Sequence, residues 1–145
     1  MASILIADDH AVSRFVLERQ LARAGHRTAS VQNGAQALEA LENGRFDLLL
    51  LDVRMPVLDG VRTVHWLRAS QRHYARIPIL AVTACAMSGD RERFLQAGMN
   101  EYLSKPFTRE TLLACVERLL ALPGVAGLPS PTQKDALQAW ETELR

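Results

Sequence analysis

The sequence predicts an α/β fold with a five-stranded parallel sheet, and three observations support this prediction. Short apolar segments alternate five times with longer amphipathic ones, as expected when crossover helices join parallel strands. The central segment, Leu48–Leu51, is four leucines in a row, so both of its faces must be covered. Several apolar segments end directly in charged or hydroxyl residues, and sites in open α/β sheets lie beyond the carboxyl ends of the strands.

The five predicted strands are short apolar runs bounded by polar residues, glycine or proline. They are expected at residues 4–7, 27–31, 48–51, 77–83 and 101–104. The second run is more polar than the others, which favours an edge position in the sheet. Pro78 is compatible with the fourth strand only because it stands near the start of that strand.

Helices are predicted between the strands, because apolar residues recur there at three- and four-residue spacing. They are expected at residues 11–24, 34–43, 61–67, 88–97 and 109–120. In the first helix the spacing predicts one core-facing side, made of Val16, Leu17, Leu21 and Ala24. Gly25 is expected to end this helix in a left-handed conformation.

The chain divides into two parts at Leu122. Residues 1–122 are predicted to form one domain, and residues 123–145 a linker followed by a C-terminal helix. Proline and glycine mark the linker, and Ser130-Pro131 has the pattern of a helix start. This short final helix favours a segment of a larger protein over a complete one, although the sequence leaves both open.

Composition excludes several classes of function. The net charge of +1 and the absence of a basic patch argue against nucleic acid as a partner. No apolar run approaches the roughly 20 residues that a membrane-spanning helix needs. The first residues, 1–6, have neither the basic region nor the cleavage site that a signal peptide is expected to have. The two cysteines, Cys85 and Cys115, stand in different elements, which fits a reducing cytoplasm better than a disulfide framework.

Chemically active side chains stand at the ends of four predicted strands: Asp8 and Asp9, then Asp52, Thr83 and Lys105. Parallel strands bring these ends to one edge of the sheet. Three carboxylates there repel one another by roughly 4 kcal/mol per pair at ~4 Å, and one lysine offsets only part of this. Oxygen ligands without histidine or cysteine clusters suit Mg²⁺, which in turn indicates phosphate chemistry. An aspartate in such surroundings can act as a nucleophile toward phosphorus, and we assign that role to Asp52.

Each of these residues also has a simpler structural explanation. Asp52 could cap a turn, and Asp8 or Asp9 could cap the first helix. Thr83 could be an ordinary β-branched strand residue. What favours the chemical interpretation is the set, because every member ends a strand.

This ordered set resembles the receiver (response-regulator) domain of two-component signalling, over about residues 3–122. The resemblance rests on four motifs in order: Asp8-Asp9, Asp52 within D-V-R-M-P, Thr83-Ala84 and Lys105-Pro106. It implies a doubly wound, flavodoxin-like sheet with the strand order 2-1-3-4-5. The residues that make up these motifs are most similar to those in receivers of hybrid sensor histidine kinases.

The resemblance also implies a function and its residues. A histidine kinase would donate a phosphoryl group from phosphohistidine to Asp52, and the group could pass on to a histidine phosphotransfer domain in a phosphorelay. Asp8, Asp9, Asp52 and the backbone carbonyl of Arg54 would hold Mg²⁺. Thr83 and Lys105 would take part in the chemistry, and Thr83 with Tyr102 would switch a partner-binding face. Such a domain is not an enzyme toward other substrates, since it catalyses only its own phosphorylation and dephosphorylation.

Two other functions remain open at this point. A haloacid-dehalogenase-like Mg²⁺ phosphohydrolase also uses an aspartate nucleophile at a strand end, but that family needs a second aspartate two residues later, where this chain has Arg54. A degenerate receiver could act as a constitutive protein-binding module. The complete set of acidic residues, threonine and lysine argues against that alternative.

Overall fold

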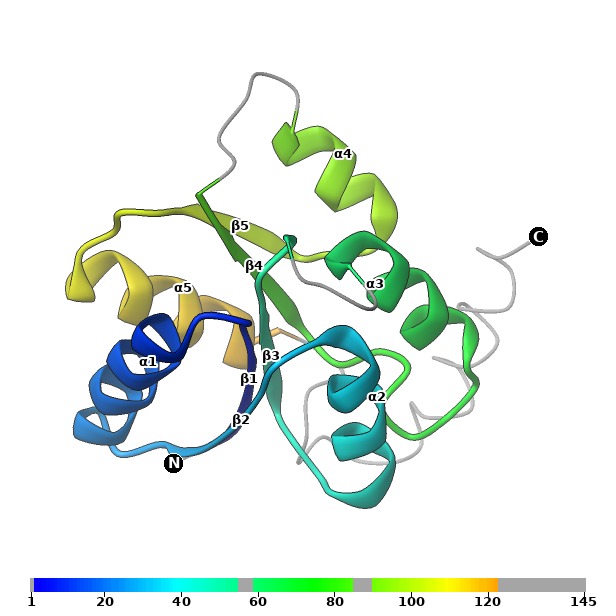
Figure 1. Ribbon diagram of the computed structural model, residues 1–145, viewed down its shortest axis with the longest axis horizontal. Coiled ribbons are helices and arrows are strands. Elements are labelled where there is room, and N and C mark those ends of the chain that lie inside the picture. Colours follow the sequence, from blue (N-terminus) through cyan, green and yellow to red (C-terminus); the bar gives the residue numbers. More distant parts are fainter. Residues whose placement is uncertain (1, 55–58, 85–89, 123–145) are drawn as a thin grey trace.

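The computed structural model describes residues 2–54, 59–84 and 90–122, and all structural statements below concern these residues. Figure 1 shows a single twisted sheet with helices on both faces. The predicted linker and C-terminal helix, together with Cys85, lie outside the described residues.

The sheet has five parallel strands in the order β2-β1-β3-β4-β5, which confirms the predicted fold class and strand order. The strands are β1 Ser3–Ala7, β2 Arg27–Val31, β3 Leu48–Leu51, β4 Ile79–Thr83 and β5 Glu101–Ser104. β4 therefore begins two residues later than predicted. Ile77 is buried, but its amide donates to the Tyr74 carbonyl in the preceding turn and not to a neighbouring strand.

The helices are α1 Ala11–Arg23, α2 Gly34–Asn43, α3 Gly60–Ala69, α4 Asp90–Ala97 and α5 Arg109–Leu120. Three of them begin with a side-chain cap, in which an oxygen accepts from a backbone amide three residues later. The capping residues are Asn33, Asp59 and Thr108. The predicted start of the fourth helix, at Ser88, lies outside the described residues.

The core has two layers, one on each face of the sheet. Alternate leucines of β3 point to opposite layers: Leu49 and Leu51 pack toward α2, α3 and α4, and Leu48 and Leu50 pack toward α1 and α5. All four leucines are at most 1% exposed. The prediction that this strand is covered on both faces is therefore confirmed.

The predicted core-facing side of α1 is partly wrong. Leu17 and Leu21 are buried as expected, but Val16 is 39% exposed and Ala24 is exposed too. Val16 lies with Val12 and Phe15 on a side of the helix that the rest of the described domain does not cover. Residue spacing shows that apolar residues share a helix face, but it does not show whether the fold covers that face.

Gly60 brings the start of α3 against the end of β3. Its amide donates to the Val53 carbonyl at 2.9 Å, and a Cβ atom at this position would lie 2.7 Å from the Val53 Cα. No side chain fits in that space, so glycine is required there. The contact fixes the backbone directly after Asp52.

Candidate functional site

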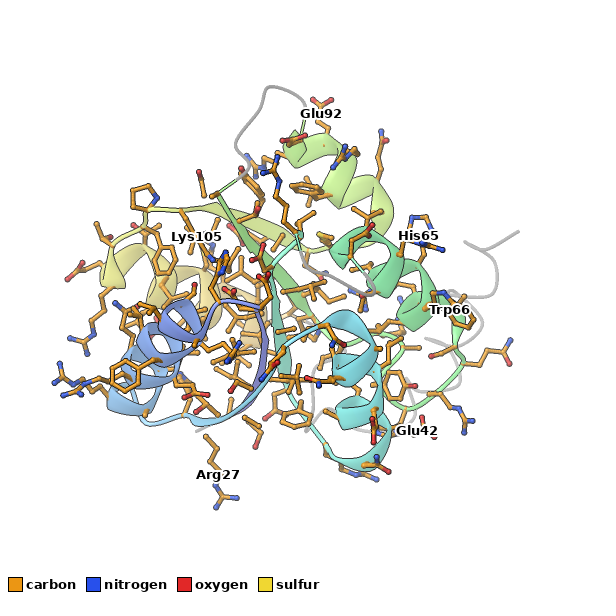
Figure 2. All side chains as sticks on the ribbon, viewed as in Figure 1. Arg27, Glu42, His65, Trp66, Glu92 and Lys105 are labelled. Carbon is orange, nitrogen blue, oxygen red and sulfur yellow. The ribbon has the colours of Figure 1, made fainter. Side chains whose placement is uncertain are left out.

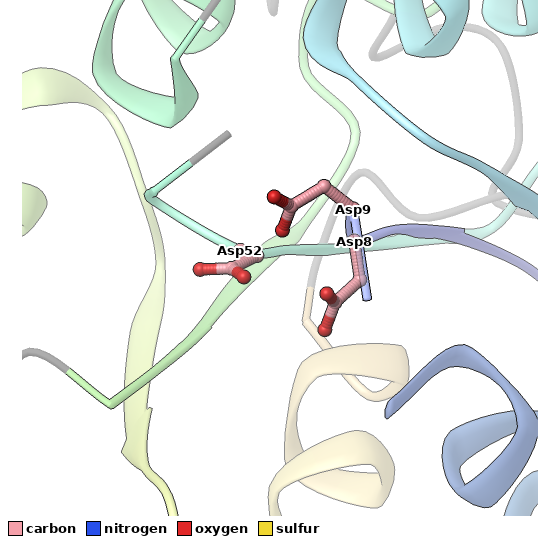
Figure 3. A group of neighbouring side chains, drawn as sticks. All are labelled: Asp8, Asp9 and Asp52. Atoms are coloured by element: carbon pink, nitrogen blue, oxygen red, sulfur yellow. The ribbon is translucent and has the colours of Figure 1, made fainter. Parts of the chain in front are cut away.

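The three predicted carboxylates meet at the carboxyl edge of the sheet. Asp8 and Asp9 follow β1, and Asp52 follows β3, the neighbouring strand (Figure 3). One oxygen atom from each carboxylate lies within 4.8 Å of those of the other two. The structure thus brings Asp52 together with an aspartate pair that stands more than 40 positions before it in the chain.

Lys105 lies between these carboxylates. Its ammonium nitrogen is 2.9 Å from Asp8 Oδ2 and 3.9 Å from Asp52 Oδ2. Its backbone amide donates to the Thr83 carbonyl, which joins the end of β5 to the end of β4. Figure 2 shows the lysine side chain directed toward the middle of the sheet edge. One ammonium group therefore lies within 4 Å of two carboxylates.

Asp52 is held by its neighbours and kept from water. Its backbone amide donates to Ala7, its Oδ1 accepts from the Arg54 amide at 3.0 Å, and the residue is 6% exposed. Burial raises the pKa of Asp52 to about 6. The Arg54 hydrogen bond and Lys105 oppose this shift of the pKa, and the charges of Asp8 and Asp9 add to it. The phosphoacceptor candidate is thus a carboxylate whose charge the protein alone does not fully stabilise.

Asp8 and Asp9 differ in how their oxygens are satisfied. Burial by itself would raise the pKa of Asp8, but hydrogen bonds from the His10 amide, Lys105 and Ser13 outweigh it, and the pKa is lowered. Asp9 Oδ1 is buried and accepts no hydrogen bond from the residues that the structure describes. Neither aspartate caps α1, because His10 occupies the N-cap position without a side-chain cap.

The site fits a hard divalent cation. It offers carboxylate oxygens from three residues, and one of them, Asp9 Oδ1, is buried without a hydrogen-bond partner in the described part of the chain, with His10 Nε2 3.9 Å away. Such an oxygen is costly to bury unless something compensates for its lost hydration. Mg²⁺ is commonly bound by one or two carboxylates together with water, which this arrangement allows.

Thr83 and Tyr102 lie on the same side of the sheet. Thr83 is the last residue of β4, is 0% exposed and pairs with Ser104, while Tyr102 pairs with Ala81. Side chains alternate along a strand, so Thr83 points to the layer that contains Ala81 and the Tyr102 ring. The Tyr102 ring packs on Phe94 of α4, with ring centroids 5.6 Å apart. Both predicted switch residues therefore face the layer that α4 covers.

The sequence did not indicate two further residues that contact the site. Ser13 Oγ accepts a hydrogen bond from Lys105 at 2.9 Å, and Arg14 Nη1 donates to the Asp8 carbonyl at 2.8 Å. Both belong to the first turn of α1, which begins just after the aspartate pair. Their nearness to that pair in the chain was the available signal, but polar residues in a first helical turn are too common to be informative.

A doubly wound sheet with three carboxylates and a lysine at its carboxyl edge defines a class of phosphoryl-accepting signalling modules. The family model of the response regulator receiver domain matches residues 4–117. The chain belongs to this family, and its function is that of a phosphoacceptor receiver in two-component signalling.

Its relatives include both sensor histidine kinases and response regulators. Over 115 residues it is 36% identical to the sensor histidine kinase GacS of Pseudomonas protegens, covering 78% of this chain and 12% of that protein. Over 120 residues it is 32% identical to the polar-differentiation response regulator DivK of Brucella anthropi, covering 81% of this chain and 95% of that protein.

Among solved structures, the receiver domain of sensor histidine kinase PA1611 from Pseudomonas aeruginosa is similar in fold and sequence. It has a TM-score of 0.77 and 42% sequence identity, covering 83% of this chain and 98% of that one. That domain carries a magnesium ion coordinated in its active-site cleft. The site described above shares the acidic character that such an ion requires.

The raised pKa of Asp52 gives a prediction for stability. Without divalent cations, Asp52→Asn is expected to raise the free energy of unfolding at pH 7 by about 1–3 kcal/mol. The folded protein holds a proton on Asp52 up to pH about 6, whereas the reference pKa of the group is 3.8. The contribution of Asp52 to the free energy of unfolding therefore falls as the pH rises from about 4 to about 6 and changes little above that. The variant lacks this pH-dependent loss.

Urea unfolding of both proteins at a series of pH values measures the difference. The difference between the two free energies of unfolding should grow from about pH 4 to about pH 6. It should become smaller when Mg²⁺ is added, because a cation favours the ionised carboxylate. A difference that stays constant from pH 4 to pH 8 would contradict the assignment of the shift to Asp52.

Proposed function

We propose that Asp52 is the phosphoacceptor and that its phosphoryl group comes from the phosphohistidine of a histidine kinase. The observation that carries this proposal is the position of Asp52, 3.9 Å from the Lys105 ammonium group and close to two further carboxylates. An Asp52 oxygen would form the new P–O bond while the P–N bond of the donor breaks. The electron pair of that bond returns to the imidazole, which takes up a proton.

The other residues have separate roles in this proposal. Lys105 neutralises charge on the phosphoryl oxygens and orients them. Asp8, Asp9, Asp52 and the Arg54 backbone carbonyl are proposed to hold Mg²⁺, which when bound supplies further positive charge at the same oxygens. The buried Asp9 oxygen without a hydrogen-bond partner supports this assignment.

Thr83 and Tyr102 are proposed to report phosphorylation to a partner. Thr83 would turn its hydroxyl to the phosphoryl group, and Tyr102 would move into the space that becomes free. Their common side of the sheet and the packing of Tyr102 on Phe94 support a response that reaches α4.

The test uses the full chain, acetyl phosphate and Mg²⁺, followed by intact mass. One phosphoryl adduct per chain, formed only with Mg²⁺, is the expected result. Repeated release of inorganic phosphate without an adduct would indicate a phosphohydrolase instead. No adduct and no release would indicate a degenerate receiver that only binds proteins.

The apolar side of α1 supports a protein as the donor. Val12, Phe15 and Val16 are 76%, 58% and 39% exposed, and they stand two to six residues after His10 in the chain. A protein that brings a phosphohistidine to Asp52 must approach this edge of the sheet. We therefore assign the apolar side to contact with a histidine kinase phosphodonor domain or a histidine phosphotransfer domain.

Phe15→Ala is expected to slow transfer from a phosphorylated histidine kinase roughly tenfold, because an exposed aromatic ring is a common centre of binding energy. Labelling by acetyl phosphate should not change. Trp66→Ala is the matched control, since Trp66 is 66% exposed on α3. Radiolabel transfer measures both variants, and equal rates for Phe15→Ala and the wild type would contradict this role of α1.

The wider setting of the chain is also a proposal. We place residues 1–122 as the receiver unit, with residues 123–145 as a linker and helix, and the chain as a cytoplasmic module of a relay or of a hybrid kinase. No helix among the described residues has the length and apolar character needed to cross a bilayer. The many hybrid-kinase relatives, of which the chain spans about a tenth, support the second setting.

A further inference from the structure

An open cleft of about 680 Å³ lies beside the phosphoacceptor. It runs between the end of β3, the first turn of α3 and α4. Its described lining consists of two valines, three arginines and one aspartate: Val53, Val61, Arg54, Arg62, Arg93 and Asp59. Val53 and Arg54 directly follow Asp52 in the chain, so this cleft opens next to the proposed site.

The cleft carries an excess of positive charge. Arg54, Arg62 and Arg93 are exposed, and no ion pair joins any of them to a carboxylate in the described part of the chain. The one acidic residue of the lining, Asp59, already accepts a hydrogen bond from the Arg62 backbone as the cap of α3. The Arg93 guanidinium lies over the Phe94 ring, 5.1 Å from its centroid, which leaves its charge available.

We infer that this cleft binds a carboxylate-bearing segment of the protein that delivers the phosphoryl group to Asp52. The inference rests on the proposed function, because it takes the delivering protein as the occupant. A protein that places its phosphohistidine against Asp52 covers the carboxyl edge of the sheet. The residues that line the cleft place it at that edge, on the side of α3 and α4. The helix α1 covers the opposite face of the sheet (Figure 1).

The charges of the lining favour several carboxylates over one compact anion. The three arginines come from different elements and are exposed, so their guanidinium groups can each meet a separate carboxylate in a two-bond arrangement. A compact anion is usually held by converging, buried donors. Val53 and Val61 add apolar walls, which suit the aliphatic parts of glutamate side chains in a peptide.

The first measurement uses hexaglutamate as the probe. Titration of the full ¹⁵N-labelled chain with Mg²⁺ at physiological salt should shift the arginine Nε–H signals of Arg54, Arg62 and Arg93. The variant R62Q/R93Q should lose this binding. The control R23Q/R27Q removes the same charge at the opposite end of the sheet, where Figure 2 shows Arg27, and should bind like the wild type.

Two outcomes of this titration would overturn the inference. One is hexaglutamate binding that R62Q/R93Q leaves unchanged. The other is pyrophosphate that shifts the same arginine signals at lower concentration than hexaglutamate does, because the cleft would then select a small polyanion. Hexaglutamine serves as the uncharged peptide control and should shift none of the three signals.

The second measurement separates this inference from the proposed function. R62Q/R93Q should accept a phosphoryl group from acetyl phosphate at the wild-type rate, and transfer from a phosphorylated histidine kinase should fall roughly tenfold, with the loss smaller at high salt. R23Q/R27Q should match the wild type in both assays. An unchanged kinase rate in R62Q/R93Q overturns the inference alone, whereas a wild type that acetyl phosphate cannot label overturns the proposed function.

Discussion

Asp52→Asn is expected to fold like the wild type and to accept no phosphoryl group from acetyl phosphate in the presence of Mg²⁺. An amide oxygen lacks the charge that makes the carboxylate a nucleophile, and no other acidic side chain of the site has the same contacts. Asp8 is already bound by Lys105 and by the His10 amide. Intact mass after incubation measures the loss, which should be complete.

Asp59→Asn is the matched control for this substitution. Asp59 stands seven residues beyond Asp52, is exposed, and caps α3 through a side-chain oxygen that an asparagine also provides. The control should therefore be labelled like the wild type. Labelling of Asp52→Asn at the wild-type rate would show that another residue accepts the phosphoryl group.

Arg68→Met is expected to lower the free energy of unfolding by about 3–5 kcal/mol, the largest stability effect that we predict. The five N–H groups of its guanidinium all donate hydrogen bonds, and their acceptors are the carbonyls of Gly98, Ala75 and Ile77 and the Asn100 side chain. Burial lowers the pKa of Arg68 to about 10, with Arg76 adding to the shift, so the group stays charged at neutral pH. The substitution leaves several carbonyls without their donor.

Arg72→Met provides the comparison for Arg68. Arg72 forms an ion pair with Glu42, but its side chain is 61% exposed, so the pair contributes at most about 1 kcal/mol. Urea unfolding of the two variants measures the contrast. Equal losses of stability would mean that the hydrogen bonds of Arg68 are replaced by water at little cost.

The strands of the sheet could be predicted because each one is indicated by a short run of neighbouring residues. Four consecutive leucines cannot occupy a half-exposed strand, and β3 is indeed buried on both faces. Asp52 and Lys105 could be placed at one edge for the same reason, since parallel strands share a direction. The strand order, however, came from resemblance to a family, because periodicity describes each element alone and not its neighbours.

The features that sequence reasoning missed depend on distances across the fold. Val16 has the spacing of a core residue, yet 39% of it is exposed in the described domain. Arg68 looks like a surface arginine at the end of a helix, yet its hydrogen bonds reach the turns before β4 and β5. Arg93 stands 31 residues beyond Arg62 in the chain, and the two line one cleft only because α3 and α4 lie on the same face of the sheet.

The close contact at Gly60 affects how the cleft and the phosphoacceptor move. The Gly60 amide is bonded to the Val53 carbonyl, and the backbones touch with no side chain between them. Side chains normally absorb small displacements between packed elements, as an elastic layer would. Without that layer, the first turn of α3 and the end of β3 form a stiff unit. If a bound partner displaces Arg62, we therefore expect the backbone next to Asp52 to be displaced with it.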